Sequence, residues 1–223
     1  MTHGPLAVID YGAGNLTSVE NALRHLGASF FVTSQPADLA RAAGLIFPGV
    51  GEAAASMAVL RRTGLDEALR SFFASGRKVL GICIGCQVIF ERSEERNTEC
   101  LGLLEGTVRR FPALPGLKIP HMGWNGVRFT REHPLFEGIP QGSSFYFVHS
   151  YYPSPGSDDL TAAETDYGVT FPSCIARGNL AAFQFHVEKS GAVGLRLLRN
   201  FLDWDGRWSG SPAGGTGEEP GRA

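Results

Sequence analysis

The sequence has little of what a disulfide scaffold or a nucleic-acid-binding protein requires. Its 223 residues include four cysteines, Cys83, Cys86, Cys100 and Cys174, whereas small disulfide-stabilised domains are far denser in cysteine. The formal net charge is −2 and no basic block occurs, which argues against a nucleic acid held through its phosphates. We therefore expect reduced thiols and a cytoplasmic location, with Cys100 and Cys174 as ordinary small residues.

Long apolar runs are also missing. No stretch reaches the ~18 apolar residues that a membrane span needs, and the N-terminus lacks the basic and apolar regions of a signal peptide. Cys83 and Cys86 are not accompanied by a second Cys-x-x-Cys or a paired-histidine motif, so we predict no metal site and no cofactor. The 43% of hydrophobic and 19% of charged residues are typical of a folded globular domain.

The first half of the chain alternates between apolar runs and helical patterns. The predicted strands are residues 6–10, 29–33, 45–47 and 79–82, and the predicted helices are residues 16–26, 36–43, 52–62 and 65–75. Such alternation indicates βαβ units and a parallel sheet with helices on both faces. Ligands of these sheets bind beyond the carboxyl ends of the strands, where three glycine-bearing turns fall, at residues 12–15, 48–51 and 81–85.

The second half contains short apolar stretches separated by turns. The predicted strands are residues 106–111, 126–130, 144–152, 160–165, 169–177 and 180–185, and a helix begins at Ser190 and ends near Trp204. We therefore predict an α/β fold of one domain, residues 1–206, with a mostly parallel central sheet, flanking helices and an antiparallel extension in the C-terminal half. Residues 207–223 are rich in glycine and proline, which predicts a disordered tail.

The strongest local signal is the stretch from Lys78 to Gln87. An apolar run ends at Ile82, glycines stand two residues either side of Cys83, and a helical pattern follows. Glycines suit a sharp strand-to-helix turn that crowds its neighbours. A thiol at a helix N-terminus is favoured as the thiolate by the aligned peptide dipoles.

This cysteine has three interpretations. Cys83 and Cys86 are spaced as a thioredoxin-like redox pair, or both simply pack in the core, or Cys83 alone is a nucleophile. The glycine frame favours the nucleophile, as does Gln87, which lies on the same helix face. His186 follows an apolar strand and Glu188 follows two residues later, which together supply a base and the acceptor that orients it.

These motifs resemble those of the class I (triad) glutamine amidotransferases. The resemblance rests on residues 81–87 and on residues 183–190, Phe-Gln-Phe-His-Val-Glu-Lys-Ser. The blocks at residues 9–16, 47–51, 120–125 and 146–152 are similar to the glutaminase subunits of imidazole glycerol phosphate synthases, and the resemblance covers about residues 6–203. Two positions depart from the family pattern, since Val187 replaces a proline and Cys86 replaces a methionine.

The resemblance implies a flavodoxin-like fold and a catalytic triad of Cys83, His186 and Glu188 that hydrolyses glutamine through a thioester. It also implies an oxyanion hole made by the Ile84 N–H and by the strand of residues 48–51, which turns into place only on activation. The site residues that it implies in these two roles are Gly49, Val50, Gly51 and Ile84 for the oxyanion hole, and Gln87, His149, Ser150 and Tyr151 for glutamine.

A partner is implied as well, namely the cyclase, a (β/α)8 barrel that forms a heterodimer with the glutaminase and receives its ammonia. Asn15, Met122, Trp124 and Lys189 match positions that face this partner, although Trp124 alone would equally be read as a core aromatic. The alternatives are the glutaminase of another amidotransferase, such as pyridoxal phosphate synthase, or a thiol–disulfide oxidoreductase.

Overall fold

The computed structural model describes residues 4–12 and 16–210. Its central sheet has eight strands in the order β2-β1-β3-β4-β14-β13-β12-β9. The first five strands in this order pair in parallel and the last three are antiparallel. The strands are β1 Leu6–Ile9, β2 Phe30–Thr33, β3 Gly44–Phe47, β4 Lys78–Ile82, β9 Arg128–Phe129, β12 Thr161–Tyr167, β13 Val169–Arg177 and β14 Leu180–Phe183. The predicted α/β fold with an antiparallel extension is confirmed.

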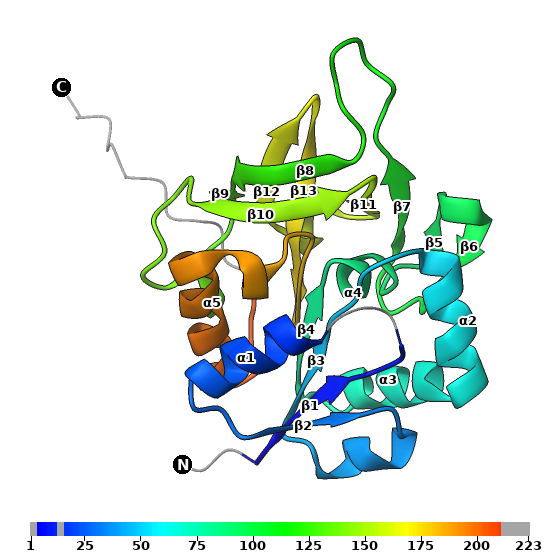
Figure 1. The fold of residues 1–223 in the computed structure, drawn as a ribbon, viewed down its shortest axis with the longest axis vertical. Helices are drawn as coiled ribbons and strands as arrows, with labels where there is room; N and C mark the ends of the chain where they lie inside the picture. The colour runs from blue at the N-terminus through cyan, green and yellow to red at the C-terminus, as the bar shows by residue number, and fades with distance from the viewer. Residues whose placement is uncertain (1–3, 13–15, 211–223) are drawn as a thin grey trace, which may run out of the picture.

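Helices cover both faces of this sheet (Figure 1). On one face lie α1, Thr17–His25, and α5, Gly191–Asp203, and on the other lie α2, Ala53–Thr63, and α3, Leu65–Ala74. The strands alternate between the two cores because successive side chains of a strand point to opposite faces. In β1, for example, Leu6 and Val8 pack with α1 and α5, whereas Ala7 and Ile9 pack with α2 and α3.

A buried lysine joins the sheet to the last helix. Lys78, the first residue of β4, is 5% exposed, and its ammonium donates to the carbonyls of Phe201, Leu202 and Trp204 at 2.7–2.9 Å. The last carbonyls of a helix lack partners within the helix and carry the negative end of its dipole. Lys78 therefore closes the C-terminal end of α5 and fixes it to the strand that leads to Cys83.

Two smaller sheets lie beyond the carboxyl ends of the parallel strands. One pairs β8, His121–Gly126, with β10, Ser144–His149, and the other contains β5 Arg92–Ser93, β6 Thr98–Glu99, β7 Gly106–Arg110 and β11 Tyr151–Pro155. The predicted single strand 144–152 is wrong, because the chain leaves one sheet after His149 and enters the other at Tyr151. Strand β8 was not predicted, since its exposed face carries apolar residues and breaks the usual alternation.

The C-terminal segment is ordered further than we predicted. Residues 207–210 pack against the domain: Trp208 Nε1 donates to Glu132 O, and Arg131 Nη1 donates to Gly210 O, both at 2.7 Å. Residues 211–223 lie outside the described residues, so the disorder predicted for them stays a prediction. Of the predicted turn at residues 12–15, only Gly12 is described. Among the described residues, no helix is long and apolar enough to cross a membrane.

Candidate active site

Cys83 lies on a sharp turn between the end of β4 and the start of α4, Ile84–Gln87. Its φ of 54° and ψ of −104° are rarely adopted by residues other than glycine and indicate backbone strain. The turn leaves no room for side chains on either side. A Cβ on Gly85 would lie 1.9 Å from Phe47 O, and one on Gly81 would lie 2.8 Å from Gly85 O. The two glycines are therefore a steric requirement of the turn.

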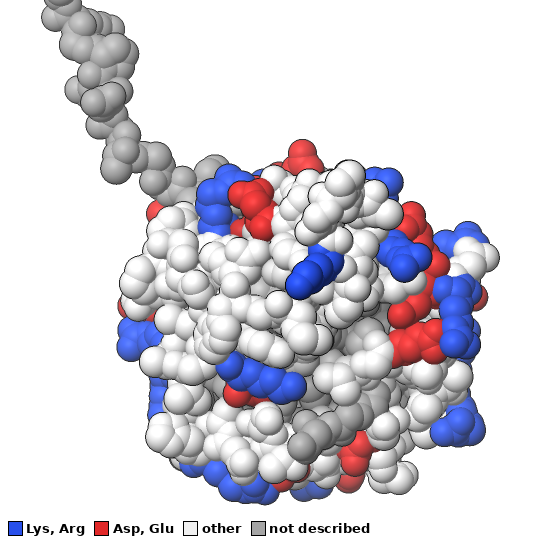
Figure 2. Space-filling view, turned by 45° about the horizontal axis from the view of Figure 1, so that its top comes forward, with Lys and Arg blue, Asp and Glu red and all other residues white. Residues whose placement is uncertain are grey.

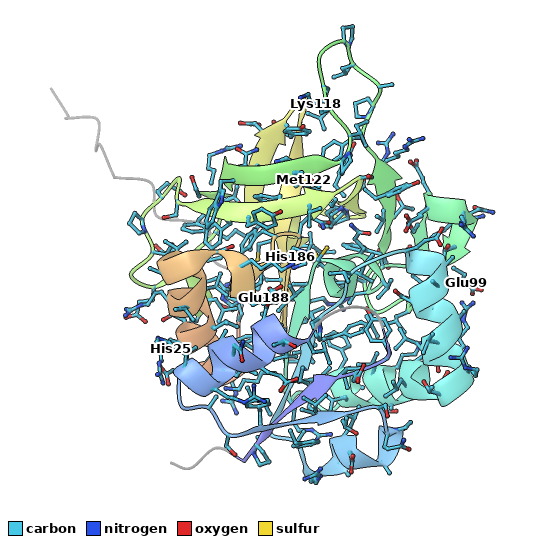
Figure 3. The ribbon with its side chains drawn as sticks, in the orientation of Figure 1. His25, Glu99, Lys118, Met122, His186 and Glu188 are labelled. Atoms are coloured by element: carbon cyan, nitrogen blue, oxygen red, sulfur yellow. The ribbon has the colours of Figure 1, made fainter. Side chains whose placement is uncertain are left out.

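His186 follows β14 and meets Glu188 at the same end of the sheet. The His186 N–H donates to Tyr146 O at 2.9 Å, and His186 Nδ1 lies 2.7 Å from Glu188 Oε1. The short helix η5, Val187–Lys189, turns the chain so that Glu188 reaches back to the imidazole ring. The two side chains are only 1% and 6% exposed and lie next to each other (Figure 3).

The charge of His186 is set by its neighbours. Burial by itself lowers the pKa of the imidazole, but hydrogen bonding and negative charge from Cys83 and Glu188 outweigh burial and raise the pKa to about 10. The ring is therefore an imidazolium at neutral pH. Because Glu188 takes Nδ1, it is Nε2 that interacts with the thiol, and Nε2 has no nitrogen or oxygen partner among the described residues.

A cavity of about 240 Å³ opens onto these groups. Its lining includes residues from several parts of the chain, namely Val50, Gly51, Cys83, Ile84, Gln87, Glu95, Pro120, Val148, His149, Ser150, Tyr151 and His186. A larger hollow of about 890 Å³ lies elsewhere, around β9 and Trp208, and contains no cysteine. The smaller cavity is thus where a compact substrate would meet the thiol.

The chain matches one protein family along nearly its whole described length. The model of the family "Glutamine amidotransferase class-I" matches residues 7–204. The chain belongs to the class I glutamine amidotransferases. Two relatives are named imidazole glycerol phosphate synthase subunit HisH. The one from Dehalococcoides mccartyi is 51% identical over 88% of this chain and 96% of its own, and the one from Chloroflexus aurantiacus is 49% identical over 89% and 95%.

A solved structure agrees with this amidotransferase fold. A putative GMP synthase component from Thermoplasma acidophilum superposes with a TM-score of 0.68, covering 91% of this chain and 94% of that one. Because its sequence is only 19% identical, the likeness supports the fold alone. The central sheet and its helix layers therefore have the same arrangement in two proteins whose sequences have diverged widely.

In this amidotransferase, the backbone N–H that we expect in the oxyanion hole already donates a hydrogen bond within the protein. The Ile84 N–H donates to Gly49 O at 3.5 Å, a long hydrogen bond. The next residues are loosely surrounded, since Val50 is 37% exposed and Gly51 has a φ of +100° with no atom within 4 Å of a built Cβ. Residues 48–51, which follow β3 as irregular backbone, therefore place an acceptor on the expected donor in this structure.

Gln87 lies in the cavity wall with its side chain engaged by protein groups. Its Nε2 donates to Tyr151 O at 2.9 Å and to Gln184 Oε1 at 3.0 Å. The Gln184 Nε2 in turn donates to Cys83 Sγ at 3.8 Å. Gln184 was not predicted from the sequence, although a polar residue in an otherwise apolar strand end, two positions before His186, was a signal that could have found it.

The imidazole of His149 points into the protein. Its Nδ1 donates to Tyr151 O at 2.7 Å, which leaves Nε2 as the acceptor for His121 Nδ1 at 2.9 Å. Asn125 Nδ2 then donates to the other nitrogen of His121 at 3.2 Å. Burial lowers the pKa of His149 to about 3 and that of His121 to about 4, so both rings are neutral. Any contact of His149 with glutamine therefore has to come from its backbone, while its ring orients the Tyr151 carbonyl.

Cys86 is not placed as a redox partner. It is fully buried, and burial, with a smaller contribution from Cys83, raises the pKa of its thiol well above the ordinary value. A resolving cysteine has to form a thiolate at accessible pH. The surroundings of Cys86 therefore disfavour the redox interpretation and agree with a packing role.

The residues assigned to a partner surface are exposed where they are described. Met122 and Trp124 of β8 are 63% and 58% exposed, so the interpretation of Trp124 as a core aromatic is wrong. Their strand lies on the face above the active site (Figures 1 and 3), and much of that face lacks charged side chains (Figure 2). Lys189 follows Glu188 in η5 and is also exposed, whereas Asn15 lies outside the described residues.

Proposed function

We propose that this chain is the glutaminase subunit of imidazole glycerol phosphate synthase, which hydrolyses glutamine to glutamate and ammonia in histidine biosynthesis. The observation that carries the proposal is that Cys83 and His186 line one cavity while Glu188 is hydrogen-bonded to the far side of the His186 ring. Relatives that are half identical over nearly their whole length and carry the name of this subunit support it.

The chemistry begins with the Cys83 thiolate, which attacks the side-chain amide carbon of glutamine. His186 protonates the departing ammonia, and water then attacks the glutamyl thioester with His186 as the base. Acylation removes the negative charge on sulfur that helps to raise the His186 pKa. The same ring is therefore a firm cation beside the thiolate and becomes a better proton donor once the sulfur has bonded to the amide carbon, which is when ammonia has to leave. Glu188 holds the ring in place throughout.

The negative charge that develops on the amide oxygen needs backbone donors. One such donor typically contributes about 3 kcal/mol to transition-state binding. The Ile84 N–H is one donor, and the N–H of Val50 becomes the second when the peptide between Gly49 and Val50 turns over. This turn also removes Gly49 O from Ile84, so the glutaminase on its own is held at low activity.

Glutamine is bound between α4 and the start of β11. Gln87, Ser150 and Tyr151 line the cavity and offer an amide, a hydroxyl and backbone groups to the substrate. The His149 ring does not contact glutamine but orients the Tyr151 carbonyl by donating a hydrogen bond to it. No step requires a metal or a cofactor.

Ammonia has to reach a second active site before it is protonated or lost. The partner is the cyclase, a (β/α)8 barrel, bound as a heterodimer in the cytoplasm at the surface that carries Met122, Trp124 and Lys189. We assign Asn15 to the same partner from the family resemblance. An exposed methionine and tryptophan on one strand are residues that protein interfaces favour. The relatives do not favour the glutaminase of pyridoxal phosphate synthase.

The test is ammonia production by wild type and by Cys83→Ala, each with and without the cyclase and imidazole glycerol phosphate. Wild type in the complex should form glutamate, and a glutamyl adduct on Cys83 should be detectable by mass spectrometry after rapid acid quench. Cys83→Ala should form neither, while still binding the cyclase. Glutamate production by the alanine variant, or failure of wild type to bind the cyclase, would refute the proposal.

A further inference from the structure

Tyr11 carries a buried hydroxyl that the fold does not use. It follows β1 and Asp10, is 4% exposed, and packs its ring against Phe47 with centroids 5.5 Å apart. The hydroxyl has no hydrogen bond of normal geometry to any described residue. Burial raises the pKa of this phenol far above its ordinary value, and a weak side-chain hydrogen bond with Ser56 offsets burial only in part. Buried hydroxyls nearly always have a partner, so this one calls for a reason.

The hydroxyl touches the strand that closes the oxyanion hole. A Cβ built on Gly49 would lie 1.9 Å from the Tyr11 hydroxyl oxygen and 3.1 Å from the Ile84 Cβ. Glycine is therefore required at position 49 because Tyr11 occupies the space of its side chain. The Tyr11 hydroxyl therefore contacts Gly49, the same residue whose carbonyl accepts the hydrogen bond from the Ile84 N–H.

We propose that Tyr11 is a positioning residue whose hydroxyl receives the Gly49 carbonyl when the strand turns to form the oxyanion hole. This inference rests on the turn described in the proposed function. When the peptide turns, Gly49 O gives up the Ile84 N–H and needs another donor inside the protein, since a buried carbonyl without a partner is costly. Tyr11 is a described buried donor that touches Gly49, and apart from a weak interaction with Ser56 its hydroxyl has no hydrogen bond of normal geometry.

This exchange makes the turn possible without a net loss of hydrogen bonds. In the closed form Gly49 O is bonded and the tyrosine hydroxyl is not, and in the open form the Tyr11 hydroxyl donates to Gly49 O. The Ile84 N–H is then free for the substrate oxygen. Tyr11 therefore stabilises the active form alone and contributes no hydrogen bond to the resting one.

The variant Tyr11→Phe removes only this hydroxyl. Loss of one hydrogen bond from the open form should lower the kcat of the isolated glutaminase by about fivefold, with an unchanged KM for glutamine. In the complex with cyclase and imidazole glycerol phosphate, where the open form is already favoured, the loss should be the same or smaller. The melting temperature should change little, because in the resting form the hydroxyl has only its weak interaction with Ser56 to lose.

Two controls separate this inference from the proposed function. Ser56→Ala removes the neighbouring hydroxyl and should keep the wild-type kcat. If the cyclase activates wild type while Tyr11→Phe keeps the full kcat in both states, the role of Tyr11 is refuted and the turn survives. If wild type is not activated, the turn itself is refuted.

A structure of the complex with Cys83 alkylated by 6-diazo-5-oxo-L-norleucine tests directly whether the Tyr11 hydroxyl donates to Gly49 O in the open form. Gly49 O should lie within about 3.2 Å of the Tyr11 hydroxyl oxygen, the range of a hydrogen bond. Gly49 O bonded to another donor would refute the role of Tyr11, and Gly49 O still bonded to Ile84 N would refute both proposals.

Discussion

Two glycine-containing segments flank the active site, and they differ in how firmly the fold holds them. The turn around Cys83 is fixed by backbone contacts, since a Cβ on Gly85 would lie only 1.9 Å from Phe47 O. In the segment of residues 48–51, a Cβ on Gly49 would first meet side chains, chiefly that of Tyr11, and there is space around Gly51 and an exposed Val50. The difference supports the proposal that the nucleophile is held permanently in position, whereas the oxyanion hole is the part that activation rearranges.

The strongest test of this difference in rigidity is to add a methyl group to a glycine in each segment. Gly85→Ala forces a backbone clash and should lower the free energy of unfolding by more than about 4 kcal/mol, with loss of glutaminase activity. Gly51→Ala meets only the strain of its positive φ, about 1–2 kcal/mol. Chemical denaturation of both variants checks this order. Equal costs would mean that the two segments are held alike.

The rigid segment should also depend on Lys78, because β4 leads directly to the turn. Lys78→Met leaves three carbonyls at the end of α5 without their donor and should cost about 3 kcal/mol of folding free energy. The exposed Lys118 supplies the matched control, and Lys118→Met should stay within about 0.5 kcal/mol of wild type. Similar melting temperatures for the two variants would show that Lys78 does not stabilise the junction between β4 and α5.

Glu188 tests how the fixed segment sets the charge of His186. The folded pKa of about 10 lies above the ordinary value of 6.5, so protonation stabilises the fold fully below pH 6.5 and this contribution is lost as the pH rises toward 10. Glu188→Gln keeps a hydrogen-bond acceptor but removes the charge. The His186 pKa should fall, the stability lost at alkaline pH should shrink, and kcat should drop by about tenfold or more.

An NMR titration of the His186 ring and unfolding at several pH values measure these effects. Glu164→Gln, which removes a carboxylate from a surface ion pair with Arg128, is the control and should leave the His186 titration unchanged. A His186 pKa that is the same in Glu188→Gln and wild type would contradict the assigned role of Glu188.

The smallest effect is expected at Cys86, which is part of the rigid segment but not of the chemistry. Cys86→Ala removes one buried sulfur atom and should cost about 1 kcal/mol, with glutaminase activity within about twofold of wild type. Peroxide-treated wild type should show no linkage between residues 83 and 86 by mass spectrometry. A disulfide there, with redox activity lost in Cys86→Ala, would restore the oxidoreductase interpretation.

The rigid region could be predicted from the sequence far better than the adjustable one. The parallel strands could be located from apolar runs that end in glycine. The turn could be located from Cys83 with a glycine two residues to either side. Both are local signals in the sequence. The meeting of His186 with Cys83 joins residues about a hundred positions apart, and it was predicted from the residue types that such chemistry needs and from the family resemblance.

The parts that could not be predicted depend on contacts that leave no local pattern. The break at Ser150 arises because β10 and β11 pair with different strands. The inward turn of the His149 ring depends on His121, twenty-eight residues away. The unused Tyr11 hydroxyl is visible only once Gly49 is seen against it. Pairings of this kind are set by the tertiary structure.

The central claim is that the nucleophile is ready while the oxyanion hole is closed. The direct measurement is the ratio of glutaminase kcat in the complex with cyclase and imidazole glycerol phosphate to kcat of the isolated glutaminase. Because one missing donor costs about 100-fold or more in kcat, we predict a ratio of at least about 100. An isolated glutaminase that hydrolyses glutamine as fast as the complex would contradict the claim.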